Sequence, residues 1–286
     1  MPNADVIVFH VIDGLIWGCI VALIALGLSL IFGIMRIINM AHGDMFMVGA
    51  VLAVLVANRF GNIWLALIIA PLVLGITTMP VERWVLRPYE GKPVATMVGT
   101  LGLSFIIQQL VLITWGGTPA VVPSPFSFVV RVAGVPIPGY RFVAAGIGLG
   151  LIALLWGLVY RTRFGLLLRA TISRPDIAEA CGIDTSRVRA LSFGLGAALA
   201  AIGGVLASPI RNVFYLMGSD VLLFAFIVVI VGGLGSLAGT LVAAIALSGM
   251  EGLLSAFFQP VDARIIIFLL MTAVIVVRPR GILVRT

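Results

Sequence analysis

RTRFGLLLRATISRPDIAEACGIDTSRVR, residues 161–189, is the longest run of this sequence that could not lie within lipid. It holds six arginines and three carboxylates, namely Arg161, Arg163, Arg169, Arg174, Arg187 and Arg189 with Asp176, Glu179 and Asp184. The chain on both sides of it is almost wholly apolar. Charged side chains are costly in a bilayer, so we interpret this stretch as a polar segment outside the membrane, between two spanning segments.

The composition of the whole chain is typical of a polytopic helical membrane protein. Of its 286 residues, 62% are hydrophobic and 10% are charged, whereas soluble domains are about 45–50% apolar and about 25% charged. A spanning helix needs about 20 apolar residues, because the hydrocarbon is about 30 Å thick. The apolar runs are continuous and do not alternate, which excludes a transmembrane β-barrel. We expect an all-α polytopic membrane protein with one domain, residues 1–286.

Nine apolar runs are candidate membrane spans. Their approximate ranges are 12–32, 43–57, 63–81, 94–114, 142–160, 190–209, 221–234, 241–258 and 263–277. The seventh and eighth runs can be full spans or a re-entrant pair, and the second alternative reduces the number of crossings. The sequence therefore predicts eight or nine transmembrane helices.

The basic residues predict the orientation of the chain, because cytoplasmic loops carry an excess of Lys and Arg. With an outside start, thirteen basic residues fall inside: Arg36, Arg83, Arg87, Lys92, the six arginines of residues 161–189, Arg278, Arg280 and Arg285. The five that fall outside are Arg59, Arg131, Arg141, Arg211 and Arg264. We expect the N-terminus outside and the C-terminus in the cytoplasm.

Other classes of protein fit the sequence poorly. The net charge of +7 comes from basic residues at the ends of apolar runs, which is a topology signal and not a nucleic-acid site. The two His and two Cys have no metal-ligand spacing, so we expect no metal site. The N-terminus lacks a basic segment, so we expect no cleaved signal peptide.

An outer connector is expected at residues 116–140, GGTPAVVPSPFSFVVRVAGVPIPGY, which contain five prolines. Proline blocks helix continuation, so the connector should be non-helical. FSFVVRV and VPIPG, separated by Ala133 and Gly134, predict a small β-hairpin.

The stretch 161–189, which we expect to be a cytoplasmic loop, contains one predicted short helix, residues 174–181. Ser173 is a candidate N-cap, and Asp176 could reach back to complete a capping box. Pro175 is tolerated in the first turn, and Gly182 is a candidate C-cap. An apolar stripe, formed by Ile177, Ala178 and Cys181, favours a docking element, while the alternative is a plain solvated loop.

A second polar cluster lies in GIMRIINMAHGDMFMVGA, residues 33–50. Its polar members are Arg36, Asn39, His42 and Asp44. Non-helical backbone at membrane depth is tolerated where it lines a cavity, and Asn39 or His42-Gly43-Asp44 could cap the next span. The candidates for a translocation path here are Asn39, His42, Gly43 and Asp44. The alternative is that these side chains only satisfy backbone groups at a helix junction.

Small residues recur in VGGLGSLAGT, residues 231–240, and in the sixth span. Such spacing predicts close helix packing or a discontinuous helix, and Gly232 and Gly235 are further candidates for the path. A phosphate-binding loop is excluded because the only lysine, Lys92, has no GxxxxGK[ST] context. Glu251 has no opposite charge within ten residues; it could face the path or bond to a neighbouring helix. Asp13, Gln108 and Gln109 are weaker candidates.

Three motifs of this chain resemble a known family. They are GLSLIFGIMRIINMAHGDMFMVGA (27–50), RATISRPDIAEACGIDTSRVRALSFGLGAALAAIGGVL (169–206) and GGLGSLAGTLVAA (232–244). They are similar to segments of the permease subunits of branched-chain amino acid ABC importers, and the similarity covers nearly the whole chain.

This resemblance implies a function and a set of partners. The chain would be the transmembrane subunit of an importer for amino acids or related small solutes in the bacterial inner membrane. It would pair with a second, homologous permease, two cytoplasmic ATPases that bind ATP and Mg²⁺, and an outside binding protein. The coupling helix that contacts an ATPase would comprise Ser173, Arg174, Pro175, Asp176, Ile177, Glu179, Ala180, Gly182 and Ile183.

Two alternatives from other classes remain. A self-sufficient secondary transporter would need buried carboxylates for ion coupling, and acids within the spans are sparse. An intramembrane enzyme would need a catalytic motif, and no HExxH or Ser–His pair is present.

Overall fold

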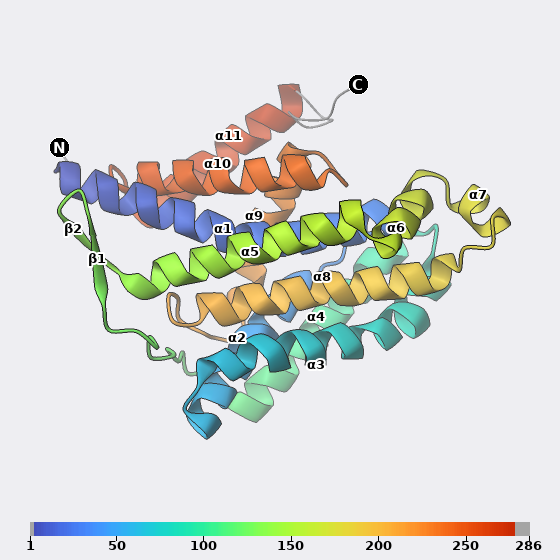
Figure 1. The fold of residues 1–286 in the computed structure, drawn as a ribbon, viewed down its shortest axis with the longest axis horizontal. Helices are drawn as coiled ribbons and strands as arrows, with labels where there is room; N and C mark the ends of the chain where they lie inside the picture. Colours follow the sequence, from blue (N-terminus) through green and yellow to red (C-terminus); the bar gives the residue numbers. More distant parts are fainter. Residues whose placement is uncertain (1–2, 278–286) are drawn as a thin grey trace.

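The computed structural model describes residues 3–277, which are almost wholly α-helical (Figure 1). The α-helices in this part of the chain are α1 (Ala4–Met35), α2 (His42–Phe60), α3 (Ala66–Val81), α4 (Pro93–Trp115), α5 (Gly139–Arg161), α6 (Arg163–Ser173), α7 (Pro175–Ala180), α8 (Thr185–Ala207), α9 (Met217–Gly232), α10 (Leu237–Ser255) and α11 (Pro260–Val277). Short turns η1 (Ile63–Leu65), η2 (Glu82–Leu86) and η3 (Arg87–Tyr89) flank α3, and strands β1 (Val129–Val132) and β2 (Val135–Pro138) precede α5. The predicted helical membrane fold is confirmed.

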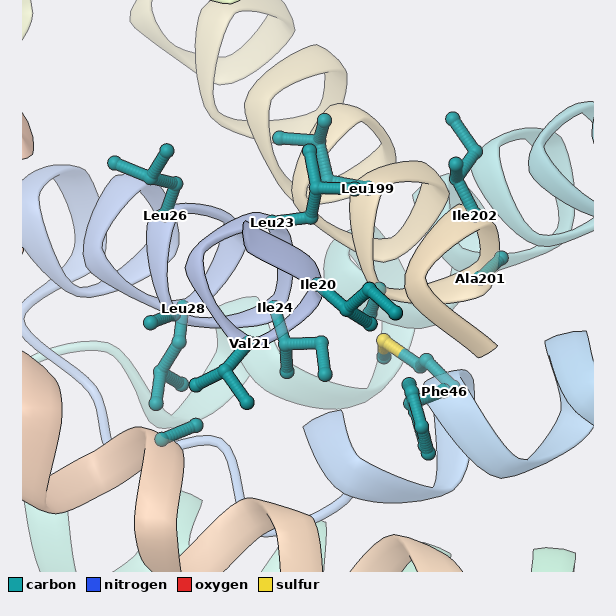
Figure 2. Close-up of a cluster of buried hydrophobic side chains, with 14 of the residues drawn as sticks. Ile20, Val21, Leu23, Ile24, Leu26, Leu28, Phe46, Leu199, Ala201 and Ile202 are labelled. Atoms are coloured by element: carbon teal, nitrogen blue, oxygen red, sulfur yellow. The ribbon is translucent and has the colours of Figure 1, made fainter. Parts of the chain in front are cut away.

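Helix α1 is the centre of the bundle. Every residue from Gly18 to Ile31 is buried, and α1 packs against α10, α8, α5 and α9. A helix that is apolar on all sides belongs in an interior. Figure 2 shows Ile20 and Ile24 of α1 in one cluster with Phe46 of α2.

Glycines let several helix pairs approach closely. A Cβ at Gly27 of α1 would lie 2.6 Å from the carbonyl oxygen of Gly196 in α8, and a Cβ at Gly239 of α10 would collide with the carbonyl of Gly232 in α9. No side chain larger than hydrogen fits at these crossings without a backbone shift. The prediction that the small residues serve close helix packing is confirmed.

Seven helices of the described part are long and apolar enough to cross a membrane. Helix α9, with 16 residues, is shorter. The expected eight or nine crossings and the orientation of the termini stay predictions. Three of the basic residues counted for that orientation, Arg278, Arg280 and Arg285, lie outside the described residues. The first helix begins at Ala4 and not near residue 12, because residues 6–9 are apolar and Asp5 suits the first turn of a helix.

Residues 36–41 form a non-helical segment that runs back along α1. Helix α1 ends at Arg36, which has a left-handed φ of 52°. The Nε2–H of His42 then donates to the carbonyl oxygen of Ile24, at 3.0 Å and well inside α1. On the other side, the amide of Met40 donates to the hydroxyl of Thr100 in α4 at 3.1 Å. Helix α2 therefore starts at mid-height in the bundle.

The proline-rich connector contains the predicted hairpin. Strands β1 and β2 are antiparallel, with Val130 opposite Ile137. The two turn residues, Ala133 and Gly134, have φ values of 51° and 87°, as the tight hairpin turns that match strand twist require. The hairpin and the start of α1 lie at one end of the bundle, which we call the hairpin end; α6 and α7 lie at the other, which we call the α7 end (Figure 1).

Helix α6 was not expected, because the sequence reasoning treated residues 161–173 as loop. The Thr162 hydroxyl caps it by accepting from the amide of Gly165 at 3.1 Å. Gly165, Leu168 and Thr171 form its buried face. A buried face with this helical spacing is the signal that would have found α6.

Candidate coupling helix and translocation path

Helix α7 projects from the α7 end, between α6 and α8 (Figure 1). Its predicted N-terminal cap is wrong. Ser173 is the last residue of α6, Arg174 precedes α7 with φ −147° and ψ 85°, and no side chain caps the helix. The residue before a proline is pushed out of the helical region, so Pro175 places the break at Arg174 and removes the capping box of Ser173 and Asp176.

The predicted C-terminus of α7 is confirmed. Gly182 has a left-handed φ of 83°. Its amide donates to the carbonyl of Glu179 at 2.9 Å, and the amide of Ile183 donates to the carbonyl of Ala178 at 3.0 Å. These paired bonds close the helix as a glycine C-cap does. The predicted range of 174–181 exceeds the observed helix by one residue at each end. These two extra residues, Arg174 and Cys181, are the cap positions of the helix.

The apolar stripe predicted on α7 is only partly right. Ala178 is 4% exposed and packs inward, whereas Ile177 is 52% exposed. Cys181 is also exposed. Because α7 is short, only one of its sides contacts the bundle. Its outer surface, with Asp176, Ile177, Glu179 and Ala180, is open to a partner.

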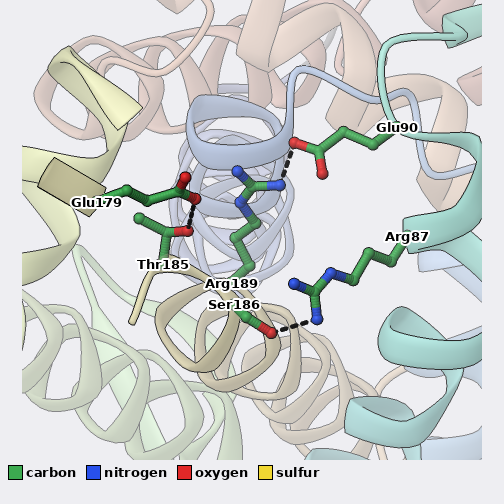
Figure 3. A network of polar contacts seen from close by, with 6 residues as sticks. All are labelled: Arg87, Glu90, Glu179, Thr185, Ser186 and Arg189. Atoms are coloured by element: carbon green, nitrogen blue, oxygen red, sulfur yellow. Dashed lines mark hydrogen bonds and ion pairs between the residues drawn. The ribbon is translucent and has the colours of Figure 1, made fainter. Parts of the chain in front are cut away.

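A polar network connects α7 to the helices of the bundle (Figure 3). The hydroxyl of Thr185, the first residue of α8, donates to the Glu179 carboxylate. One turn later, Arg189 of α8 forms an ion pair with Glu90, which follows η3. The Ser186 hydroxyl accepts from the guanidinium of Arg87 in η3. The start of α8 is thereby tied both to α7 and to the connector between α3 and α4.

The polar candidates of residues 33–50 are buried inside the bundle. Asn39 and His42 are 0% exposed and Asp44 is 2% exposed. The predicted capping is wrong: Ala41 is the N-cap of α2 and no side chain caps it. The side-chain oxygen Oδ1 of Asn39 instead accepts a hydrogen bond from the backbone amide of Ala41 at 3.2 Å. The imidazole of His42 does not cap α2, because it hydrogen-bonds to the backbone carbonyl of Ile24 in α1.

Asp44 bonds across the bundle to α4. The amide Nε2 of Gln108 donates to Oδ1 of Asp44 at 2.9 Å and also lies 3.1 Å from the hydroxyl of Ser104. The hydroxyl of Ser219, at the start of α9, is 3.3 Å away. These side chains line a cavity of about 330 Å³ whose remaining wall is mostly apolar. Gly43 also lines it. A Cβ at Gly43 would collide with the carbonyl of Gly218, so α2 and α9 are in close contact there.

The remaining path candidates do not line this cavity. Gly232 and Gly235 lie near the α7 end, where Gly235 turns the chain with φ 82° and contacts Gly33 of α1. Glu251 of α10 lies toward the hairpin end and forms an ion pair with Arg264 of α11, Oε1 to Nε, at 3.2 Å. It therefore does bond to a neighbouring helix, and it also lines a cavity. The sequence candidates form three groups and not one site.

Comparison with known proteins decides the family. The sequence profile of the branched-chain amino acid transport system permease component matches residues 10–276. This chain belongs to that family. As a permease of this family it is a multi-pass protein of the bacterial inner membrane.

Individual relatives agree with the family over nearly the whole chain. The permease is 30% identical to the high-affinity branched-chain amino acid transport permease LivH of Salmonella typhimurium, over 96% of this chain and 94% of LivH. It is 26% identical to BraD of Pseudomonas aeruginosa, over 100% and 98%. The ribose import permease RbsC of Bacillus subtilis is 26% identical, over 63% of this chain and 59% of RbsC. No solved structure matches the chain.

Sequence reasoning missed several residues that the permease brings together. Gln108 was a weak candidate, yet it is the direct partner of Asp44. The contacts of Thr185 with Glu179 and of Arg189 with Glu90 were not predicted. Their partners are up to 99 residues away in the chain, and no local pattern carries that information.

Proposed function

We propose that this permease is the transmembrane subunit of an ATP-binding-cassette importer for amino acids or related small organic solutes. Helix α7 is its coupling helix. The observation that carries the proposal is the geometry of α7, a short helix with an exposed outer surface that projects from one end of the bundle and is tied to α8. An isolated helix of this length is marginal in water, so its retention there suits a fixed contact with a partner.

The α7 end is the cytoplasmic end in this proposal, and the hairpin end faces outside. The asymmetry of basic residues supports this orientation. Two cytoplasmic ATPase subunits, which bind ATP and Mg²⁺, receive α7 at the first end. An outside solute-binding protein docks near the proline-rich connector at the second, and a homologous permease completes the pair.

Transport proceeds by alternating access. ATP binding moves the ATPases against α7, and the bond of Glu179 to Thr185 passes this motion to α8. Because α8 touches α1 at Gly27 and α2 at Gly49, its displacement shifts the helices around the Asp44 cavity. Asn39, His42, Gly43 and Asp44 lie on or beside the path, at the mid-height start of α2. Gly232 and Gly235 act as a packing joint between α9 and α10.

Site-specific cross-linking tests the coupling contact. We would place a single accessible cysteine on α7, as Ile177→Cys with Cys181→Ser, and purify the permease with its ATPase subunits. We expect a disulfide or maleimide cross-link from position 177 to an ATPase. The matched control is Val129→Cys on the exposed β1 strand at the hairpin end, which should give none. A cross-link from position 129 and none from 177 would overturn the proposal.

Uptake measurements separate the importer from a secondary transporter. In proteoliposomes that contain the permease and its ATPases, solute uptake should require ATP on the side of the ATPases and its hydrolysis. A protonophore that collapses the proton gradient should leave this uptake intact. Uptake by the permease alone, abolished by the protonophore, would favour a secondary transporter.

A further inference from the structure

Two adjoining cavities open near the hairpin end, in the part of the chain that the structure describes. Their volumes are about 240 Å³ and about 300 Å³. They share four lining residues from three helices and a loop: Trp17 of α1, Arg211 between α8 and α9, Glu251 of α10 and Arg264 of α11. Helices distant in sequence thus converge on one place.

The charges in this place are unusual for a membrane bundle. Three of the five arginines that the sequence assigns to the outer side, Arg141, Arg211 and Arg264, line these cavities. Three carboxylates accompany them. Asp13 pairs with Arg141, Glu251 pairs with Arg264, and Asp220 lines the smaller cavity. Ionisable groups inside a membrane bundle are costly, so their presence indicates a functional site.

Arg211 differs from the other two arginines. Among the described residues it forms no ion pair; its guanidinium carbon lies 4.4 Å from the ring centroid of Trp17. Stacking on the indole leaves the N–H donors at the guanidinium edge free for an acceptor. An arginine over an aromatic ring at the wall of a cavity can bind a carboxylate with both arms.

The smaller cavity adds an apolar wall to these charges. Its lining includes Val21, Phe214, Met217, Val221 and Phe224. Drug-sized ligands occupy pockets of roughly 300–1,000 Å³, so a cavity of about 240 Å³ suits a smaller solute. Two arginines, Arg211 and Arg264, two carboxylates, Asp220 and Glu251, and an apolar wall line this small volume. Charges of both signs beside an apolar wall are complementary to a zwitterion with an apolar side chain.

We propose that the permease itself carries a recognition site for such a zwitterion in the cavity bounded by Trp17, Arg211, Glu251 and Arg264. Arg211 binds the carboxylate of the solute, the Glu251 carboxylate accepts from its ammonium group, and the apolar wall holds its side chain. This inference rests on the proposed import of amino acids and assigns their first binding place on the permease. The site is separate from the Asp44 cavity.

Direct binding tests the site without the outside binding protein. The permease would be purified with its ATPases in nanodiscs, and binding of radiolabelled L-leucine, L-valine and L-phenylalanine would be measured. We expect saturable binding of at least one of them. 4-Methylpentanoate, which lacks the ammonium group, and 3-methylbutylamine, which lacks the carboxylate, should compete poorly. Arg211→Gln and Glu251→Gln should each weaken binding about tenfold or more, the loss typical of a charge-assisted hydrogen bond.

Control variants separate recognition from folding. Arg59→Gln and Asp262→Asn change exposed charges outside both cavities and should leave binding unchanged. The double variant Glu251→Arg/Arg264→Glu keeps the ion pair but reverses its polarity, so a structural pair would tolerate it while a recognition site would lose the solute. Co-purification of the ATPases reports that each variant is folded.

The inference and the proposed function fail in different ways. If the wild-type complex imports an amino acid with ATP but the permease shows no saturable binding, or binds equally well with Arg211→Gln, the site is overturned and the importer stands. If the permease binds an amino acid but does not associate with ATPases, the proposed function is overturned.

Discussion

The hydroxyl of Thr185 donates a hydrogen bond to the carboxylate of Glu179, which joins the last turn of α7 to the first residue of α8 (Figure 3). Helix α8 then runs through the bundle and crosses α1 where Gly27 meets Gly196. A displacement of α7 therefore has a direct mechanical route to the central helix. The contact is small, and its role can be measured.

Removing this hydrogen bond should uncouple ATP hydrolysis from transport. With Glu179→Leu, which lacks an acceptor, or Thr185→Val we expect the amount of solute imported per ATP hydrolysed to fall about fivefold, because a net contribution of about 1 kcal/mol is lost. ATPase subunits should still co-purify. Uptake and phosphate release in proteoliposomes measure the ratio.

The double variant Glu179→Leu/Thr185→Val is the control for this prediction. If the two residues act through one bond, the double variant should be no worse than either single variant. Additive losses would show that the two side chains act independently and would contradict the proposed route.

Gly182 should be required for its backbone conformation and not for space. A Cβ there meets nothing within 4 Å, but φ is +83°. Gly182→Val should cost about 1–2 kcal/mol locally and loosen the end of α7. Limited digestion by Glu-C protease after Glu179 should become several-fold faster. Gly157→Ala in α5, which also has open space around it, should leave digestion unchanged.

Gly239 should be required for space. Its Cβ would collide with the Gly232 carbonyl, so Gly239→Ala must push α9 and α10 apart. We expect a loss of about 1–3 kcal/mol, seen as a lower thermal unfolding midpoint of the permease in detergent. Gly102→Ala on α4, where a Cβ meets nothing within 4 Å, is the matched control. Equal midpoints for the two variants would refute the close-packing account.

Gln108→Leu should destabilise the permease much more than Gln109→Leu. Gln108 is buried and donates to Asp44, so Gln108→Leu leaves a buried carboxylate without its partner and should cost about 1–3 kcal/mol. Gln109 is exposed on the bundle surface, so Gln109→Leu should change stability by no more than about 0.5 kcal/mol. Thermal unfolding compares the two, and a larger loss for Gln109→Leu would contradict the assigned contacts.

Much of the fold was predictable because it rests on local signals. Apolar runs located the long helices, and the hairpin followed from two short apolar segments around Ala133 and Gly134. The end of α7 followed from Gly182, since glycine is the residue that adopts a left-handed φ without strain. The start of α7 did not follow from Ser173, because the proline at 175 overruled the capping preference through its effect on Arg174.

The candidate sites were predictable in kind but not in arrangement. The sequence indicated that Asn39, His42, Asp44 and Glu251 are polar groups in an apolar chain. It could not indicate that His42 bonds to Ile24, that Asp44 bonds to Gln108, or that Glu251 pairs with Arg264. Each partner is on another helix, and which helices adjoin depends on the packing of the whole bundle.

The sequence by itself determined that this is a helical membrane protein, where most of its long apolar helices lie and that residues 161–189 are excluded from lipid. The reason is that the cost of exposing polar groups to hydrocarbon acts residue by residue. Only the tertiary structure decided that α2 starts at mid-height, that α7 is tied to α8, and that Arg211, Trp17 and Glu251 surround one cavity. Those relationships arise from close contact between distant segments, which glycine crossings such as Gly27 with Gly196 permit and no local pattern specifies.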